Sequence, residues 1–355
     1  MKNGRSLVDL ARELSRQLAS KRDMTVPSGL MRHESSDNGT TKILVETPTD
    51  VEAFTTTELF RRQLADKLKI PFAYFERMRT EEPNLLDRNV NTWLQSDPDR
   101  RLVRTLDGHA RAYLSDRYRR LDNYDLAEHV LPMLQRLPDA RFESVELTPL
   151  RMYLKVVTPR VEFEIQPGDF VQAGVAISNS EVGQGSLSVQ PLVYRLVCKN
   201  GLIAADHAMR KMHVGRLSDA ALDEVTVFRD DTLRADDKAF FLKVRDVVES
   251  AVSEATLRLI AERMRKTLGI KLTGDPVKTV EVLGTRFLLF NEQERTGVLR
   301  FLIEGGDLSG YGLINAVTHY SQEVDDYDRA TDFEALGGKL LDQTAAEWET
   351  LAEAA

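Results

Sequence analysis

The 355-residue sequence contains a single cysteine, no long uncharged hydrophobic run and none of the short motifs that mark common enzymes. Cys198 cannot form an intramolecular disulfide, so we expect a reducing, cytoplasmic compartment. A lone Cys with scattered His offers no recognised zinc-ligand spacing, and we expect neither a metal nor any other cofactor. Residues 6–19 form an amphipathic pattern and not the apolar run of a signal peptide or membrane span, so no membrane attachment is expected.

Missing catalytic motifs favour a non-enzymatic protein. The sequence has no phosphate loop with Gly-Lys-Ser or Gly-Lys-Thr, no Gly-x-Ser-x-Gly turn and no His-Glu-x-x-His. Gly183 and Gly185 stand between predicted strands and precede no helix, so they fit a turn better than a dinucleotide site. His207 and His213 are six residues apart, which does not place them on one helical face as a metal-binding pair.

Acidic charge is concentrated near the C-terminal end. The net charge is -8, yet residues 1–300 hold 46 Lys and Arg against 44 Asp and Glu, whereas residues 301–355 hold 2 against 12. Such a segment can bind a basic partner, screen a basic site or keep the protein soluble. A protein partner for this acidic region is therefore one prediction, with simple solubility as the alternative.

Hydrophobic periodicity predicts an α+β fold with a central antiparallel sheet between an N-terminal and a C-terminal helical region. We expect three parts: a helix and loop over 1–54, an α+β core over 55–216, and a mainly helical region with the acidic tail over 217–355. Residues 28–41 are expected to form a loop. Helices are expected over 6–19, 59–68, 72–78, 124–137, 232–268, 292–303, 312–323 and from about 342; further strands are expected over 141–147, 152–158, 170–178, 186–189 and 192–198.

Asp107-Gly108 is the clearest turn signal, because Asp-Gly suits the positive φ angles of a type I′ hairpin. Strands over 101–106 and 109–114 would then pair with Arg104 facing Arg111. Like charges directly opposite each other destabilise a hairpin, so the two arginines require an anion between them. Carboxylates from elsewhere in the fold are one candidate for this anion, and the phosphates of a bound ligand are the other.

Residues 100–120 hold seven Arg and only two acids, Asp107 and Asp116. Arg binds phosphate through paired hydrogen bonds and Tyr stacks on exposed bases, so this region is predicted to bind nucleic acid, with single-stranded DNA favoured. A second basic group surrounds residues 198–201. The predicted nucleic-acid contacts are Arg101, Arg104, Arg111, Tyr113, Arg117, Tyr118, Arg119, Arg120, Arg195, Lys199, Arg210 and Lys211.

Several separated motifs resemble a known family. They are residues 113–123, residues 179–185 with Asn179-Ser180-Glu181, residues 195–202, and residues 315–318 with the nearby Tyr320. Together they resemble a phage and plasmid-like family known as domain of unknown function 932, over about residues 55–330. The resemblance implies a protein of a phage, prophage or plasmid, but no particular reaction.

These features predict a non-enzymatic nucleic-acid-binding protein of a phage or plasmid that acts in DNA replication, recombination or single-strand annealing. One alternative is an interaction or assembly protein that binds a host or phage protein through its long helix and acidic tail. A second alternative is an enzyme whose site is assembled from separate segments, which a search for motifs does not detect. Annealing proteins usually form rings or filaments and scaffolds also assemble, so a homo-oligomer fits either function.

Overall fold

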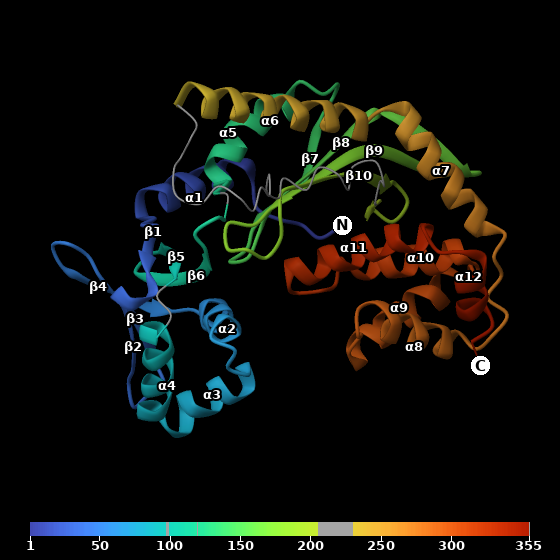
Figure 1. Cartoon of the computed structure of the whole chain (residues 1–355). Helices are drawn as coiled ribbons and strands as arrows, with labels where there is room; N and C mark the ends of the chain where they lie inside the picture. The colour runs from blue at the N-terminus through green and yellow to red at the C-terminus, as the bar shows by residue number, and fades with distance from the viewer. Residues whose placement is uncertain (97–98, 119, 205–229, 355) are drawn as a thin grey trace. The chain divides into compact units, whose positions relative to one another are not determined.

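A computed structural model describes residues 1–96, 99–118, 120–204 and 230–354 (Figure 1). Within these ranges the chain forms twelve α-helices, one short 3-10 turn and two sheets, of six and five strands. The α+β class is confirmed, and helices α1 (Leu7–Ser20) and α12 (Ala345–Ala352) stand near the two ends of the chain. The β-strands form two sheets where one central sheet was predicted.

The chain divides into two compact units. Unit 1 contains Met1–Leu10, Asp125–Ser180 and Gly185–Ala355, and unit 2 contains Ala11–Tyr124 and Glu181–Gln184. Of the predicted boundaries, the one after residue 54 falls inside unit 2, and the one after residue 216 lies outside the described residues.

Unit 2 is built on the six-stranded sheet, in the order β1-β5-β6-β4-β3-β2. Neighbouring strands are antiparallel except for the short parallel pairing of β4 with β6. The predicted loop over 28–41 is wrong, because it contains the 3-10 turn Ser28–Leu30 and an edge strand whose short, polar sequence hides its alternation. The strands are β1 (Met24–Pro27), β2 (Met31–Ser35), β3 (Thr41–Glu46), β4 (Val51–Thr56), β5 (Arg100–Leu106) and β6 (His109–Ser115).

The β5–β6 hairpin confirms the predicted turn but not the predicted register. Asp107 and Gly108 have φ angles of 52° and 75°, as a type I′ turn requires. A β-bulge then adds one residue on β6, so Arg104 lies opposite Ala112 and not opposite Arg111. The predicted Arg–Arg pair was wrong for this reason, since a bulge moves every later partner by one residue.

Three helices pack against the sheet of unit 2: α2 (Glu58–Lys67), α3 (Phe72–Glu81) and α4 (Pro83–Ser96). Thr57 caps α2 by accepting a hydrogen bond from the N–H of Phe60. Helix α4 was not predicted. The core of the unit includes Phe60, Leu64, Phe75, Leu86, Val90, Val103 and Tyr113.

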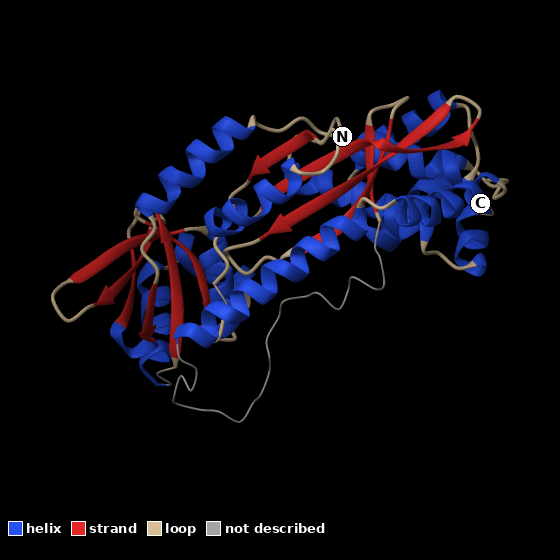
Figure 2. Ribbon diagram, turned by 90° about the horizontal axis from the view of Figure 1, so that it is seen from above, coloured by secondary structure: helices blue, strands red, loops and turns tan. Residues whose placement is uncertain are grey.

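Unit 1 is built on the five-stranded antiparallel sheet, in the order β11-β10-β9-β8-β7 (Figure 2). The predicted strands over 186–189 and 192–198 belong to one strand that passes through Pro191. Proline is tolerated because its carbonyl accepts from the N–H of Ala204, so the side that lacks an N–H faces the end of β11. The strands are β7 (Arg141–Leu147), β8 (Met152–Gln166), β9 (Asp169–Asn179), β10 (Ser188–Arg195) and β11 (Asn200–Ile203).

The helices of unit 1 enclose its sheet. Helix α6 contacts β10 and α7 contacts β8 (Figure 1). Helices α10 and α11 contact the edge strand β11. The predicted helix over 232–268 is two helices, because Ser253 caps the second one. The helices are α5 (Asn123–Gln135), which begins at the unit boundary, α6 (Asp230–Ala251), α7 (Glu254–Leu268), α8 (Pro276–Phe287), α9 (Glu292–Gly305), α10 (Gly310–Tyr320) and α11 (Tyr327–Leu341).

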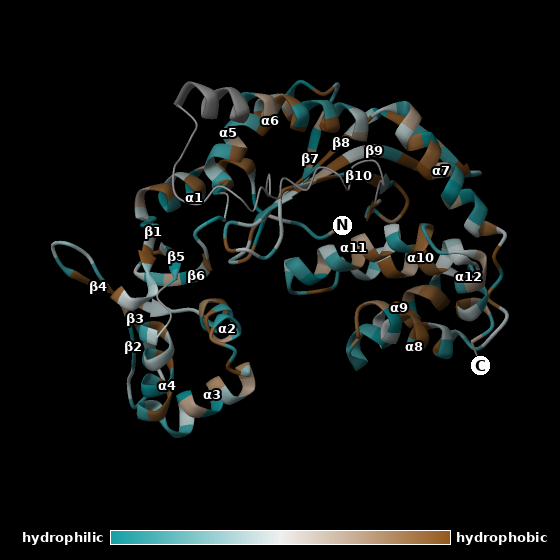
Figure 3. Cartoon of the chain, in the orientation of Figure 1, coloured by the Kyte–Doolittle hydropathy of each residue, from teal (hydrophilic) through white to brown (hydrophobic). Residues whose placement is uncertain are grey.

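Helix α7 illustrates how the core of unit 1 forms. Hydrophobic and hydrophilic residues alternate along it (Figure 3), and Leu257, Ile260 and Met264 recur at helical spacing. These residues belong to the same buried cluster as Val171 and Ala173 of β9. The amphipathic pattern of the sequence therefore becomes a helix packed on a sheet.

Candidate functional site

Arg104 of the hairpin is fully buried in unit 2 and is held by internal groups. Its Nε donates to Asp23 Oδ2 at 2.9 Å, its Nη2 donates to Asp122, and its Nη1 donates to the backbone oxygen of Glu181 at 2.9 Å. Burial by itself would lower the pKa of Arg104, but the carboxylates of Asp122 and Asp23 raise it above its ordinary value. The anions that neutralise Arg104 are therefore carboxylates of the protein itself.

The Glu181 carboxylate binds two further cations near Arg104. It accepts from Lys21 Nζ at 2.6 Å, from Arg111 Nη2 at 2.5 Å and from the backbone N–H of Asn123 at 2.7 Å. We call Lys21, Asp23, Arg104, Arg111, Asp122 and Glu181 the charge cluster. It contains three cations and three carboxylates.

The charge cluster favours the ionised form of Glu181 and Asp122. Burial by itself would raise the pKa of Glu181, yet Arg111 and Lys21 keep that pKa below its ordinary value. Asp122 shows the same balance, with burial opposed by Arg104 and Lys21. Each buried charge therefore has a partner of opposite sign, and the cluster joins the hairpin to residues 122–123 and 181.

Tyr113, the predicted stacking residue, lies in the core of unit 2. Only 5% of its surface is exposed, and its ring packs edge-on against Phe60 at 5.6 Å between centroids. Burial raises the pKa of its hydroxyl to about 12. Its position leaves no ring face on which a base could stack.

Other predicted arginines remain at the surface. Arg101 pairs with Asp99, but Arg117 and Arg120 are exposed, as is Arg100 at the first position of β5. We call Arg100, Arg117 and Arg120 the arginine rim. Tyr118 is half-buried, and Arg119 lies outside the described residues.

Arg100 and Arg120 of the arginine rim lie on the same face of the sheet of unit 2. Arg120 Nη2 donates to Thr25 Oγ1 at 2.9 Å, and Thr25 of β1 lies opposite Leu102 of β5. Arg100 is two residues from Leu102, so its side chain starts from the same face. Among the described residues, neither Arg100 nor Arg120 forms an ion pair.

The second predicted basic group lies in unit 1. Arg195 forms two hydrogen bonds with the carboxylate of Asp169, at 2.7 and 2.8 Å, and Tyr311 donates to the same carboxylate at 2.8 Å. Lys199 is exposed, in the hairpin turn between β10 and β11, with a φ of 52°. Arg210 and Lys211 lie outside the described residues.

Lys199 also lines a pocket, and the turn that carries it is tied to neighbouring segments. Asn200 Nδ2 donates to Thr318 Oγ1 at 2.5 Å, which ties the turn to α10. The carbonyl of Lys199 accepts from the Met1 ammonium. A side chain at Gly201 would come within 3.1 Å of Met1 Sδ, so glycine leaves the room that Met1 occupies.

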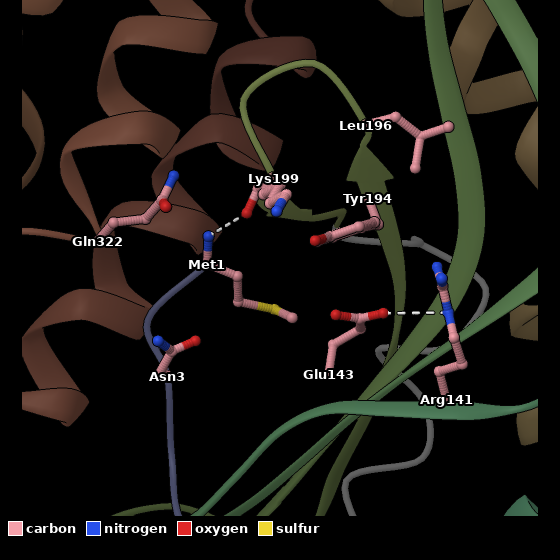
Figure 4. Close-up of a pocket in the computed structure, with 8 residues that line it drawn as sticks. All are labelled: Met1, Asn3, Arg141, Glu143, Tyr194, Leu196, Lys199 and Gln322. Carbon is pink, nitrogen blue, oxygen red and sulfur yellow. Dashed lines mark hydrogen bonds and ion pairs between the residues drawn. The ribbon is translucent and has the colours of Figure 1, made fainter.

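The pocket has a volume of about 480 Å³ and a polar lining (Figure 4). Arg141 Nε pairs with Glu143 at 3.2 Å, and Gln322 Nε2 donates to the carbonyl of Cys198 at 2.9 Å. Burial, together with the Glu143 carboxylate, raises the pKa of Tyr194. The lining residues are Met1, Asn3, Arg141, Glu143, Tyr194, Leu196, Lys199 and Gln322.

The Met1 amino group is the most perturbed base of this pocket. Burial lowers its pKa to about 6, although the Glu334 carboxylate acts in the opposite direction. Glu334 is itself buried and faces Lys155 Nζ at 2.7 Å. This buried pair lies between β8 and α11.

Acids of the C-terminal region have structural roles in unit 1. Asp326 caps α11, Asp328 accepts from the Tyr153 hydroxyl at 2.6 Å, and Glu347 closes the capping box of α12. Asp342 pairs with Arg263. Helix α11 thus begins within this acidic stretch, at Tyr327, and a protein partner for the region stays a prediction.

Sequence reasoning missed the anionic half of the charge cluster. Glu181 belongs to a motif that was noticed, yet nothing in the linear order connects it with Lys21 or Arg111. The available signal was the excess of arginine over residues 100–120, which required anions from elsewhere.

In the described part of the chain, no three metal-ligating side chains cluster as a metal ion would need. None of the described helices combines the length and apolar character that crossing a bilayer requires. The model of one protein family, described as Domain of unknown function (DUF932), matches residues 113–335, more than half of the chain. No curated protein and no solved structure matches the chain.

Proposed function

Because the chain belongs to the DUF932 family, whose description states no function, we propose a function from the charges of its described surface. The protein is a non-enzymatic nucleic-acid-binding protein that contacts phosphates through the arginine rim of unit 2. In the phage or plasmid setting that the motif resemblance implies, it would act in replication, recombination or single-strand annealing.

The charge balance of unit 2 carries this proposal. The three carboxylates of the charge cluster form ion pairs with Lys21, Arg104 and Arg111. Asp99 forms ion pairs with Arg101 and Lys67. Arg100 and Arg120 are left exposed without an ion pair among the described residues. Exposed guanidinium groups without carboxylates are suited to phosphate oxygens.

The geometry of the sheet lets both arginines reach one ligand. Thr25, which holds Arg120, and the position of Arg100 are neighbours across β1 and β5, where diagonal Cα atoms lie about 7–8 Å apart. A flexible phosphate backbone can therefore contact both guanidinium groups. Because Tyr113 is buried, this proposal depends on phosphate contacts and not on base stacking.

The test is the salt dependence of binding to labelled single-stranded and duplex oligonucleotides, measured by fluorescence anisotropy. Arg100→Ala and Arg120→Ala should each weaken binding and reduce the slope of log K against log salt by about 0.7 for a single strand. Their melting temperatures should match that of the wild type, since both side chains are exposed.

Arg88→Ala is the matched control, because Arg88 is an exposed arginine of α4 in the same unit. It should leave affinity and slope unchanged. If the wild type binds neither oligonucleotide at low salt, or if the rim variants bind as tightly as the wild type, the proposal is wrong.

A further inference from the structure

The pocket of unit 1 combines hydrogen-bonding groups of both kinds with cations. Asn3 and Gln322 each carry an amide, Glu143 carries a carboxylate, and Arg141 and Lys199 carry positive charge. Figure 4 shows Asn3 and Gln322 on one side of the pocket and Arg141 with Glu143 on the other. A ligand that fits this lining must itself present donors, acceptors and a negative charge.

Several of these groups have hydrogen-bond donors, acceptors or charge that no described residue uses. Gln322 uses its Nε2 for the carbonyl of Cys198, which leaves its amide oxygen to accept. No side-chain hydrogen bond of Asn3 and no ion pair of Lys199 occurs among the described residues. Arg141, whose side chain is half exposed, has further N–H groups beyond the Nε that faces Glu143.

We propose that this pocket binds a nucleoside monophosphate, with the base against the amides of Asn3 and Gln322 and the phosphate near Lys199. An amide presents a donor and an acceptor in one plane, which matches the edge of a nucleobase. A single cation without a carboxylate partner matches one phosphate group. The volume of about 480 Å³ is in the range of sites that enclose a molecule of this size.

The pocket is held in place by the residues that surround it. Asp169 fixes Arg195 at the end of β10, and Thr318 fixes Asn200 at the start of β11, so the turn that carries Lys199 is anchored at both ends. An anchored turn holds the Lys199 backbone in place before a ligand binds, which lowers the entropic cost of binding. The site belongs to unit 1 and does not depend on strand binding by the arginine rim of unit 2.

The test is isothermal titration of the full chain, with no residue added before Met1, against each deoxynucleoside monophosphate. Inorganic phosphate and the four nucleosides are titrated separately. The wild type should bind at least one mononucleotide at millimolar concentration or below, and more tightly than it binds phosphate or the nucleoside alone.

Lys199→Asn removes the cation while keeping a residue that tolerates a positive φ, and it should weaken mononucleotide binding about tenfold. Lys199→Arg should restore most of the affinity, whereas Lys243→Ala, at an exposed lysine of α6, should change nothing. A circular dichroism melt of each variant shows that it is folded. The proposal is wrong if no mononucleotide binds at about 10 mM, if phosphate alone binds as tightly, or if Lys199→Asn binds like the wild type.

Discussion

Asn200 and Thr318 are 118 residues apart in the sequence, yet the Asn200 amide donates to the Thr318 hydroxyl at 2.5 Å inside unit 1. The motif over 195–202 and the motif over 315–318 therefore meet at this hydrogen bond. The motifs over 113–123 and 179–185 meet in the same way in unit 2, where the N–H of Asn123 donates to Glu181. The family motifs thus form two contact sites, one inside each unit.

Thr318→Val tests the first of these sites. The substitution keeps the shape of the side chain but leaves the buried Asn200 amide without its acceptor, so we expect a loss of about 1–3 kcal/mol in the free energy of unfolding. Urea unfolding measures it. Thr285→Val, at an exposed threonine of α8, should cost little, and equal stabilities for the two variants would show that the contact contributes nothing.

The lowered pKa of Glu181 predicts that unit 2 loses stability as the solution becomes acidic. The pKa of Glu181 and that of Asp122 are lowered in the folded chain, so the unfolded chain binds more protons near pH 4. This stabilisation is present above the ordinary carboxyl pKa of about 4 and is lost as the pH falls through the lower folded value.

Glu181→Gln should therefore flatten the loss of stability between about pH 5 and pH 3. At pH 7 the variant should be less stable by about 3 kcal/mol, because Arg111 and Lys21 lose their carboxylate. Unfolding curves at several pH values measure both effects. Glu46→Gln, at an exposed acid, is the control, and an unchanged pH profile in Glu181→Gln would contradict the assignment.

Asn91 forms hydrogen bonds with the backbone of β2, the edge strand of the six-stranded sheet. Its Oδ1 accepts from the His33 N–H at 2.7 Å and its Nδ2 donates to the His33 carbonyl at 2.9 Å, as a neighbouring strand would. Asn91→Ala should lower the unfolding free energy by about 1–3 kcal/mol and increase self-association, because an open strand edge pairs with other chains. Thermal melts and sedimentation at several concentrations measure these effects. Asn84→Ala, at an exposed position of α4, should behave like the wild type, and the same behaviour in Asn91→Ala would refute the assignment.

Gly338 lets α11 approach β11 closely. A Cβ at this position would lie 2.0 Å from the backbone oxygen of Ile203, which cannot move aside as a side chain could. Gly338→Ala should therefore destabilise unit 1 by about 3 kcal/mol. Gly305→Ala has nothing within 4 Å of the new Cβ and should be neutral or stabilising by up to about 1 kcal/mol. A melting temperature for Gly338→Ala equal to that of Gly305→Ala would rule out the close packing.

The features that could be predicted from the sequence depend on near neighbours in the chain. Asp107-Gly108 specifies its turn because two adjacent residues must both adopt positive φ. The strand over 141–147 was predicted with its observed bounds, since its Phe, Val and Leu residues and the prolines at 138 and 149 on either side are local signals. Helices α4, α8 and α11 were not predicted. In α4 the buried Leu86, Val90 and Leu94 recur at helical spacing, so the local signal was present in the sequence.

The sequence by itself thus determined the α+β class, the basic hairpin and the motifs that identify the family. Only the tertiary structure decided what the arginines do. One bulge moved Arg104 away from Arg111, and Asp23, Asp122 and Glu181 came from distant segments to neutralise both. Burying a guanidinium requires a carboxylate nearby in space, and sequence order does not show which distant carboxylate the fold brings there.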